Sequence, residues 1–370
     1  MRKVYLIDYI GVHCGMHYYL EAFANRIREI DGVEPCIISN FSESGDKPAL
    51  LNQYNGSTFK KVVSLLRNMS RIRKLARGNK DDVMVFLTYG NAIEIPMLKA
   101  VAKHPCHIID VHEAIAQDVD GNLRLKNTLK SLYSSEIGCI ISHSERTDIF
   151  MNEYGYQGKV LKVPHFRYEF AKNENESNIG DDIRGIFNRD KVNLLFFGNL
   201  NVNKGVDILM EAYNRLPADV VAKANLIIAG KDFDGVCRQH QIKDDREAHL
   251  IFRHVNDDEL IHIYKNADVI CQPYRKTSQS GILEMAFYFK KPVLTTDVPY
   301  FRKTLEEFPS FGEVVSGEIT VENYAAGLAD FIRNFDRNRY FTAPDYDRYT
   351  HREAVSRFVT ALAEYLHHQK

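Results

Sequence analysis

Residues 267–297 read ADVICQPYRKTSQSGILEMAFYFKKPVLTTD, and this stretch decides the fold. Residues 268–271 form a short apolar strand that Pro273 closes, and residues 274–280 are a polar loop. Gly281 opens a run with helical spacing of apolar residues at 282–289, and Pro292 stops it before a second strand at 293–296. A strand, a helix and a second strand in this order predict a βαβ unit, and therefore a parallel sheet.

The loop that precedes this helix has a composition that suits an anion. A loop rich in serine and glycine at a helix N-terminus presents unpaired backbone N–H groups and the positive end of the helix dipole. An ordinary βαβ unit whose helix is capped by a serine has the same pattern, because so short a motif also occurs without a ligand. The loop alone therefore leaves both interpretations open.

The bulk properties are those of a globular protein without a nucleic-acid partner. The chain has 370 residues and a formal net charge of −1, which favours two domains and gives no basis for nucleic-acid binding. Its six cysteines show no CxxC or zinc spacing, so we expect reduced core residues of a cytoplasmic protein. The N-terminal apolar run is too short for a signal peptide, and no segment approaches the roughly 18 apolar residues of a membrane span.

The N-terminal half alternates strands with helices. Apolar runs at 4–8, 35–39, 83–87, 107–111, 138–142 and 159–163 predict strands, and 16–30 is an amphipathic helix. This alternation predicts a parallel, doubly wound sheet. Gly11 and Gly15 follow the first strand but do not make GxGxxG, so we expect them to let the loop approach a ligand rather than to bind a dinucleotide.

Polar side chains follow several of these strands. In a doubly wound sheet the ligand lies beyond the carboxyl ends of the strands, near the switch in strand order. A single histidine there is usually structural, but a group of such residues at that edge predicts a site. The residues concerned are His13, Tyr89, His112, His143 and His165.

Residues 59–75 predict a basic amphipathic helix. Its apolar stripe consists of Val62, Leu65, Leu66, Met69, Ile72 and Leu75. Lysine and arginine cover the remaining surface, which is either a solvated face or a patch that contacts a membrane.

A polar segment at 171–191 has the composition of a linker, and a second α/β set follows it. Strands are expected at 192–197, 225–230 and 250–252, and helices at 206–216, 257–265, 323–335 and 352–365. The expected division is an N-terminal domain at 1–175, a C-terminal domain at 176–348 and a final helix at 349–370.

Four stretches in the second half carry a family resemblance. They are FFGNLNVNKGVDILMEAY (196–213), LIIAG (226–230), ELIHIYKNADVICQPY (259–274) and SQSGILEMAFYFKKPVLTTDVP (278–299). Together they resemble the donor-binding domain of GT-B glycosyltransferases, closest to the family-4-like retaining group that builds bacterial surface polysaccharides. The N-terminal half is less specific, with DVHE (110–113), IISHSERTDIF (140–150) and VLKVPHF (160–166). The resemblance implies an α/β fold of two Rossmann-like domains facing a cleft, with the C-terminal helix crossing back to the N-terminal domain.

The resemblance also implies how the donor is bound. Lys204 matches the lysine that holds the diphosphate of a nucleotide-sugar, and it is expected to act in catalysis by stabilising the leaving group. Asn199 stands where the family often has an arginine, so the second cation is missing or comes from Arg253, Arg275 or Lys276. The remaining donor-binding residues would be His254 beside Arg253 at the base, and Ser278, Gln279, Ser280, Gly281 and Ile282 at the phosphates.

The paired-glutamate signature of the family is incomplete. Lys276, not an acid, stands eight residues before Glu284, and the register from Pro292 would put the second glutamate on Met285. Glu284 either contacts the ribose hydroxyls, as that glutamate does in relatives, or is a plain surface residue.

On the N-terminal side, His112 matches the histidine that relatives place against the donor sugar, and it is the second expected catalytic residue. His13, Gly15, His17 and Tyr89 would line the acceptor side. No protein nucleophile is expected, because the leaving phosphate itself can take the acceptor proton. No metal or cofactor is expected either.

The expected function is a retaining, metal-independent hexosyltransferase of polysaccharide synthesis. It would move a sugar from a nucleoside-diphosphate sugar to a glycan or lipid-linked acceptor, in the cytoplasm or in peripheral contact with the inner membrane face. Asn199 and the broken acid pair favour an alternative, a catalytically silent GT-B subunit that binds or scaffolds. A nucleotide-sugar epimerase would need cleft carboxylates and has different motifs, and a phosphorylase would need a cofactor lysine and a longer chain.

Overall fold

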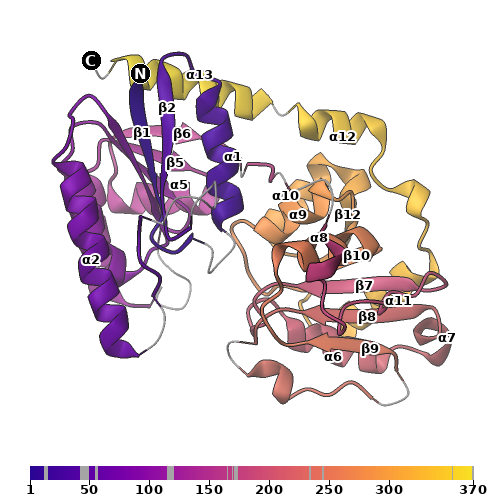
Figure 1. Cartoon of the computed structure of the whole chain (residues 1–370). Coiled ribbons are helices and arrows are strands. Elements are labelled where there is room, and N and C mark those ends of the chain that lie inside the picture. Colours follow the sequence, from indigo (N-terminus) through magenta and orange to yellow (C-terminus); the bar gives the residue numbers. More distant parts are fainter. Residues whose placement is uncertain are drawn as a thin grey trace. The chain divides into compact units, whose positions relative to one another are not determined.

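The computed structural model describes residues 1–370 except 12–15, 42–49, 55–56, 115–120, 165, 169, 171–173, 233–234, 244–245, 352 and 369–370. The chain forms two compact units (Figure 1). Unit 1 comprises Met1–Tyr168 and Arg352–Lys370, and unit 2 comprises Glu169–His351. No helix in the described part of the chain is both long enough and apolar enough to cross a membrane.

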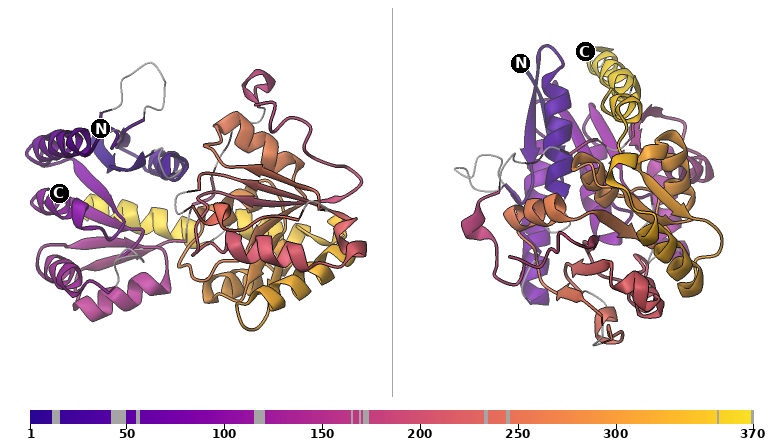
Figure 2. Two further views of the ribbon diagram at one scale, coloured as in Figure 1. Left: turned by 90° about the horizontal axis from the view of Figure 1, so that it is seen from below. Right: turned by 90° about the vertical axis from the view of Figure 1, so that its right-hand side faces the viewer.

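Unit 1 is built on a six-stranded sheet in which all paired strands are parallel. Its order is β2-β1-β3-β4-β5-β6, so the strand order reverses between β1 and β3. The central strands β3, β4 and β5 are wholly buried because helices cover both faces of the sheet, whereas the edge strand β6 is largely exposed (Figure 2). Their bounds are β1 (Arg2–Ile7), β2 (Val33–Ile38), β3 (Val83–Thr88), β4 (His107–Val111), β5 (Cys139–Ser142) and β6 (Lys159–Lys162).

The helices of unit 1 include one from the far end of the chain. Phe358 of α13 (Glu353–His368) packs against Phe23 and Phe166, with ring centroids 5.9 and 5.6 Å apart. This helix, drawn in yellow in Figure 1, is therefore part of unit 1 although it follows unit 2 in sequence. The others are α1 (Met16–Arg28), α2 (Thr58–Ala76), η2 (Ala92–Glu94), α3 (Ile95–Ala102), α4 (Leu123–Ser135) and α5 (Glu145–Tyr154).

Unit 2 is a second six-stranded parallel sheet, with the order β12-β11-β10-β7-β8-β9. Counted from its own first strand, this is the 3-2-1-4-5-6 order of a Rossmann fold, whose switch point lies between β7 and β10. The strands are β7 (Val192–Phe197), β8 (Ala224–Ala229), β9 (Ala248–Ile251), β10 (Val269–Gln272), β11 (Val293–Thr296) and β12 (Gly312–Val315).

Two helices of unit 2 begin with well-formed caps next to the carboxyl ends of its strands. Asn256 and Glu259 form a reciprocal capping box at the start of α8 (Asp257–Asn266), and Ser280 caps α9 (Gly281–Tyr288). The remaining helices are η3 (Glu176–Asn178), α6 (Val206–Arg215), α7 (Ala218–Val221), η4 (Val236–Arg238), α10 (Pro299–Glu307), η5 (Pro309–Phe311), α11 (Val321–Arg333), η6 (Arg337–Arg339) and α12 (Ala343–Thr350).

The predicted fold class, two Rossmann-like doubly wound α/β domains, is confirmed. The polar segment at 171–191, however, is not a free linker where it is described. Ile183 is fully buried, and the backbone N–H of Gly180 donates to the carboxylate of Glu259 at the start of α8. Polar composition was misleading here because the polar groups of this segment bind one another and α8 instead of water.

The prediction for the apolar stripe of the basic helix is wrong in part. Ile72 is fully buried in α2, but Val62 and Leu66 are 48 and 58% exposed, and Phe59 is 76% exposed. Leu65, Met69, Ile72 and Leu75 pack in or against the core of unit 1, whereas Val62 and Leu66 do not.

Candidate functional site

The switch point of unit 2 brings two loops together, and glycines permit their close approach. Gly205, at φ 70°, lies so near the loop after β10 that an added Cβ would be 1.9 Å from the carbonyl oxygen of Pro273. An added Cβ at Gly230 would lie 1.8 Å from the carbonyl oxygen of Gly198. The loop after β7 is thus held between the ends of β8 and β10, where a doubly wound sheet binds its ligand.

Lys204 lies in the loop after β7 and has no carboxylate partner among the described residues. Its ammonium group is 5.6 Å from the ring centroid of Tyr274, and its backbone N–H donates to the side chain of Asn201 at 2.9 Å. The Cβ position of Gly198 would be only 3.2 Å from Lys204 Nζ and 3.2 Å from Ile282 Cδ1. The predicted residues Lys204 and Ile282 therefore converge on one glycine, and the cation there is not neutralised by the described part of the chain.

The N-terminus of α9 lies at the same place. The side chain of Ser280 accepts a hydrogen bond from the N–H of Leu283 at 3.2 Å and donates to Gln272 Oε1 at 3.3 Å. Ser278 and Ser280 are buried, whereas Gln279, Gly281 and Ile282 are half-exposed. The predicted phosphate loop therefore leads into a capped helix N-terminus, whose positive dipole end suits an anion.

The two arginines considered as the second cation are engaged in ion pairs. Arg253 binds both Asp182, at 2.6 Å, and Glu259, at 2.7 Å, and these hydrogen bonds raise its pKa. Arg275 pairs with Asp207 at 2.6 Å. Both side chains fasten loops within unit 2, so neither is available as a free cation in this structure.

The other predicted donor-binding residues of unit 2 are exposed or partly exposed to solvent. Lys276 is exposed, and no ion pair joins it to a described carboxylate. His254 is exposed next to Arg253, and Asn199 is half-buried after β7. The structure therefore brings Asn199, Lys204 and the 278–282 loop to the switch point and leaves Arg253 and His254 at the end of β9.

Glu284 is not a surface residue. Its side chain lies in α9 at 2% exposure, and its carboxyl accepts a hydrogen bond from the hydroxyl of Tyr349 at 2.6 Å. The interpretation of Glu284 as a plain surface residue is therefore wrong, because the helix turns this position inward, toward α12.

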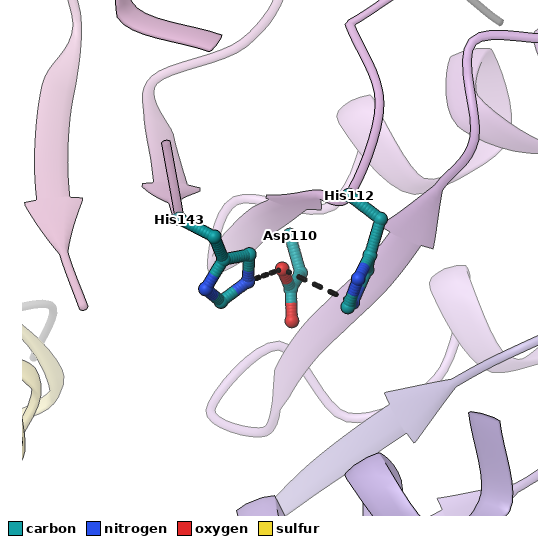
Figure 3. A group of neighbouring side chains, drawn as sticks. All are labelled: Asp110, His112 and His143. Atoms are coloured by element: carbon teal, nitrogen blue, oxygen red, sulfur yellow. Dashed lines mark hydrogen bonds and ion pairs between the residues drawn. The ribbon is translucent and has the colours of Figure 1, made fainter. Parts of the chain in front are cut away.

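The second cluster lies at the carboxyl ends of β4 and β5 in unit 1 (Figure 3). Nε2 of His143 donates to Oδ1 of Asp110 at 2.7 Å, and Nε2 of His112 lies 3.6 Å from the same oxygen. The hydroxyl of Tyr19 donates to the other oxygen of Asp110 at 2.7 Å. Asp110 therefore joins two of the histidines that the sequence placed just beyond strand ends.

Charge balance in this cluster favours an ionised aspartate. Burial alone would raise the pKa of Asp110, but the charges and hydrogen bonds of His112 and His143 outweigh it and hold that pKa well below its ordinary range. Nδ1 of His143 faces the carbonyl of Val163 at 3.1 Å, so both ring nitrogens of His143 point at acceptors. The arrangement fixes the orientation of both imidazoles.

Tyr89 connects this cluster to the end of β1. Its ring stacks on His112 with centroids 5.7 Å apart, and its hydroxyl donates to Asp8 at 2.9 Å. Its backbone N–H donates to Glu94, whose pKa burial raises to about 7. His17 lies in the first turn of α1 and packs on Tyr18, while His13, Gly15 and His165 lie outside the described residues.

The same cluster is the group of described residues that could hold a metal ion. One ligand atom each of Asp110, His112 and His143 lies within 4.8 Å of the others. However, both oxygens of Asp110 already accept hydrogen bonds, from His143 and from Tyr19. A metal would have to replace these bonds, so a hydrogen-bonded acid–imidazole network describes the geometry better.

The sequence analysis missed Asp8, Tyr19, Glu94 and Asp110. Asp8 and Asp110 sit at the ends of runs that otherwise read as fully buried strands, VYLID and HIIDV. A carboxylate inside such a run is rarely buried without a partner, and this signal could have identified both.

Residues 181–344 match the family described as glycosyl transferases group 1. A comparison with curated proteins finds no significant match.

Several solved structures are similar over nearly the whole chain. WaaG, a glycosyltransferase involved in lipopolysaccharide biosynthesis, has 16% identity and a TM-score of 0.67, with 98% of this chain and 99% of WaaG covered. HepE of Anabaena, in complex with UDP-glucose, has 12% identity and a TM-score of 0.71, with 99% of each chain covered. Sucrose-phosphate synthase of Thermosynechococcus elongatus has 13% identity and a TM-score of 0.66, with 98% of this chain and 95% of that chain covered. The chain therefore has the GT-B fold, and its residues 181–344 match the glycosyl transferases group 1.

Proposed function

We propose that this protein is a retaining glycosyltransferase that moves a sugar from a nucleoside-diphosphate sugar to a glycan or lipid-linked acceptor in surface polysaccharide synthesis. The observation that carries the proposal is the position of Lys204. Its ammonium group lies at the switch point of unit 2, next to the capped start of α9, and no described carboxylate pairs with it. A cation without a described counter-ion beside a helix N-terminus suits a diphosphate.

In the proposed reaction the leaving nucleoside diphosphate gains negative charge as the glycosidic bond breaks. Lys204 and the N–H groups of the 278–282 loop would stabilise that charge without a metal. Since Arg253 and Arg275 bind carboxylates, Lys276 is the remaining candidate for a second cation. The leaving phosphate would take the proton of the acceptor hydroxyl, so no protein nucleophile is needed.

Within unit 1, His112 is the proposed sugar-side residue. Its ring is fixed by the stacked ring of Tyr89 and by the nearby carboxylate of Asp110. Asp110 and His143 would act as positioning residues, because they set the orientation of His112. His17 and Tyr89, with His13 and Gly15, remain the proposed acceptor-side residues.

UDP-glucose is the first donor to test. The HepE structure contains UDP-glucose, and an E. coli trehalose-6-phosphate structure with a TM-score of 0.63 and 10% identity is bound with UDP-2-fluoro glucose. These ligands belong to those proteins, and they make the uracil base the first hypothesis for this one.

A lipid-linked acceptor agrees with the surface of α2. Phe59, Val62 and Leu66 are exposed, and the helix carries six basic and no acidic residues. Exposed apolar side chains among cations suit the surface of an anionic membrane. A groove of about 400 Å³ at the end of α2 adds further cations, so the positive surface continues onto α3; its basic residues are Arg73, Arg77, Lys80, Lys99 and Lys103.

The alternative is a catalytically silent GT-B subunit that only binds. Two observations favour this alternative. Asn199 stands in place of an arginine, and Arg253 and Arg275 are held in ion pairs, so fewer cations than in the family pattern would bind the diphosphate together with Lys204. A silent subunit that has kept its pocket would bind nucleotide without turnover.

A thermal-shift and calorimetric screen of UDP, GDP, dTDP, ADP and CMP, with EDTA or with magnesium, tests the proposal, followed by a turnover assay with the matching sugar nucleotides. The proposal predicts that one diphosphate binds in EDTA and raises the melting temperature, and that its sugar nucleotide is slowly hydrolysed or transferred. Binding without any turnover would favour the silent subunit. Absence of binding, or binding only with magnesium, would contradict the proposal.

A further inference from the structure

Unit 2 has a cavity at the end of its sheet opposite to Lys204, where its strands begin. The cavity has a volume of about 590 Å³ and is lined by Asn193, Asp268 and Pro292, which lie at the starts of β7, β10 and β11. This volume is in the range of small-molecule pockets, about 300–1,000 Å³. The proposed diphosphate site lies instead at the carboxyl ends of these strands, so the two sites are separated by the sheet.

The cavity is strongly basic. Only one carboxylate, that of Asp268, is among its described lining residues, and it pairs with Arg337 at 2.6 Å. His262 and Lys265, which also line the cavity, both pair with Glu174, which is not among the lining residues. The described carboxylates pair with none of the other basic residues of the lining, which are Arg189, Lys290 and Lys291.

Lys291 is partly buried, and a positive charge is less stable there than in water. Its ammonium group donates to the carbonyl of Lys265 at 2.8 Å, and burial lowers its pKa. The ammonium group of Lys290 is held 3.9 Å from the ring centroid of Tyr346. Arg337 lowers the pKa of Lys291 further, whereas Asp268 raises it. Arg189 and Lys290 are exposed, so the half-buried ammonium group of Lys291 is the one that a bound anion would stabilise most.

The walls of the cavity are aromatic. The rings of Phe335 and Tyr340 are stacked, with their centroids 6.0 Å apart, and the rings of Phe187 and Phe341 complete the lining. Aromatic and apolar surface around a few charged groups is typical of sites that bind a ring with a charged substituent.

Backbone strain is concentrated at the same place. Lys290 and Phe341, both at φ 53°, are the two non-glycine residues with positive φ in the described part of the chain, and both line the cavity. Lys290 ends α9 in a turn where its N–H bonds to Phe287 and that of Lys291 bonds to Ala286, a position that glycine usually occupies. Such strain is retained where the side chain has a role, and it gathers at ligand sites.

We propose that this cavity binds an organic phosphate, that is, a phosphate ester carried by a sugar or nucleoside ring. Arg189, Lys290 and Lys291 would bind the phosphate, and the aromatic walls would contact the ring. The proposal does not depend on the function of the Lys204 site, because it rests on the charge, lining and strain of a separate cavity.

Calorimetric titration with glucose 6-phosphate and with AMP tests the proposal, with glucose and adenosine as uncharged analogues. At least one phosphate ester should bind with a submillimolar Kd, and its uncharged analogue should not. Arg189→Ala and Lys290→Gly should each weaken binding by about tenfold or more, the loss expected for one charged hydrogen bond. Lys290→Gly is a safe variant for the fold, because glycine is the preferred residue at a left-handed helix end.

Two control variants test whether the ester binds in this cavity and not elsewhere on unit 2. Lys223→Ala removes an exposed lysine of unit 2 that does not line the cavity, and it should bind as the wild type does. Lys204→Ala should bind the phosphate ester normally while it loses UDP. The proposal is overturned if neither ester binds, if both cavity variants bind like the wild type, or if Lys204→Ala loses the ester as strongly as Arg189→Ala does. Binding of only one of the two esters supports it and identifies the ring.

Discussion

Nε2 of His143 and Oδ1 of Asp110 are 2.7 Å apart in the interior of unit 1, where the aspartate side chain is fully buried. A carboxylate buried in this way is costly to disturb, because the groups that donate hydrogen bonds to it would be left buried without their acceptor. The pair also holds the cluster that contains His112. It therefore links the stability of unit 1 to the proposed chemistry.

Asp110→Asn should destabilise the protein and change its response to acid. Loss of the carboxylate should lower the free energy of unfolding at pH 7 by roughly 3–5 kcal/mol. The folded pKa of Asp110 is depressed, so its contribution is present above the unfolded value of about 4 and is lost as the pH falls below it. Urea unfolding from pH 7 to pH 2 should therefore show a weaker loss of stability in the variant than in the wild type.

The matched control for this variant is Asp31→Asn, which removes an exposed carboxylate of unit 1. Its unfolding free energy should stay within about 0.5 kcal/mol of the wild-type value, as for most surface substitutions. If Asp110→Asn were as mild as this control, the ion pair would not have the role assigned here.

His112→Ala should separate transfer from nucleotide binding. The residue lies in unit 1, whereas the proposed diphosphate residues lie in unit 2, so UDP affinity should remain within about twofold of the wild type. The rate of sugar transfer should fall by at least about tenfold. Steady-state kinetics and calorimetry measure the two effects, and an equal loss in both would mean that His112 supports the fold instead.

Glu284 and Tyr349 offer a test of the incomplete glutamate signature. Tyr349→Phe removes the hydrogen bond to the buried carboxyl and should lower the free energy of unfolding by about 1.5–3 kcal/mol. If Glu284 also contacts the ribose, Glu284→Gln should weaken UDP binding while Tyr349→Phe leaves it nearly unchanged. Equal UDP affinity in both variants and the wild type would assign Glu284 to the structure alone.

The surface of α2 predicts binding to anionic lipid. Phe59→Ser with Leu66→Ser should reduce co-sedimentation with phosphatidylglycerol vesicles by about tenfold, because each side chain loses up to about 1.5 kcal/mol of apolar transfer. Stability should hardly change, since both positions are exposed. Ile149→Ser, at an exposed apolar residue of α5, is the control, and a similar loss there would argue against a specific membrane face.

Much of the fold could be predicted because its strands are apolar runs with clear ends. The strands at 107–111, 192–197 and 293–296 match the expected ranges to the residue. The helix α4 was missed although Leu125, Leu129 and Leu132 have helical spacing, because its polar residues resemble a loop. The order of the strands in each sheet is the part that no local pattern gives.

Only those parts of the candidate site could be predicted in which a residue is positioned by the strand and loop next to it in the sequence. Lys204 and the serine loop follow directly from the sequence, since each is placed by the strand before it. The pairing of His143 with Asp110 depends on β4 and β5 being neighbours. Asp182 and Asp207, which pair with Arg253 and Arg275, are 71 and 68 residues away from them in the sequence. Glu259, the second partner of Arg253, is 6 residues away.

The most direct test of the proposed function is a calorimetric titration of UDP into the wild type and Lys204→Ala in EDTA, with Lys223→Ala as the control. The wild type and the control should bind UDP without metal, and Lys204→Ala should lose about 2 kcal/mol of binding free energy, roughly thirtyfold in Kd. Equal UDP affinity in Lys204→Ala and the wild type would contradict the proposed function, because the uncompensated cation at the switch point would then have no part in holding the diphosphate.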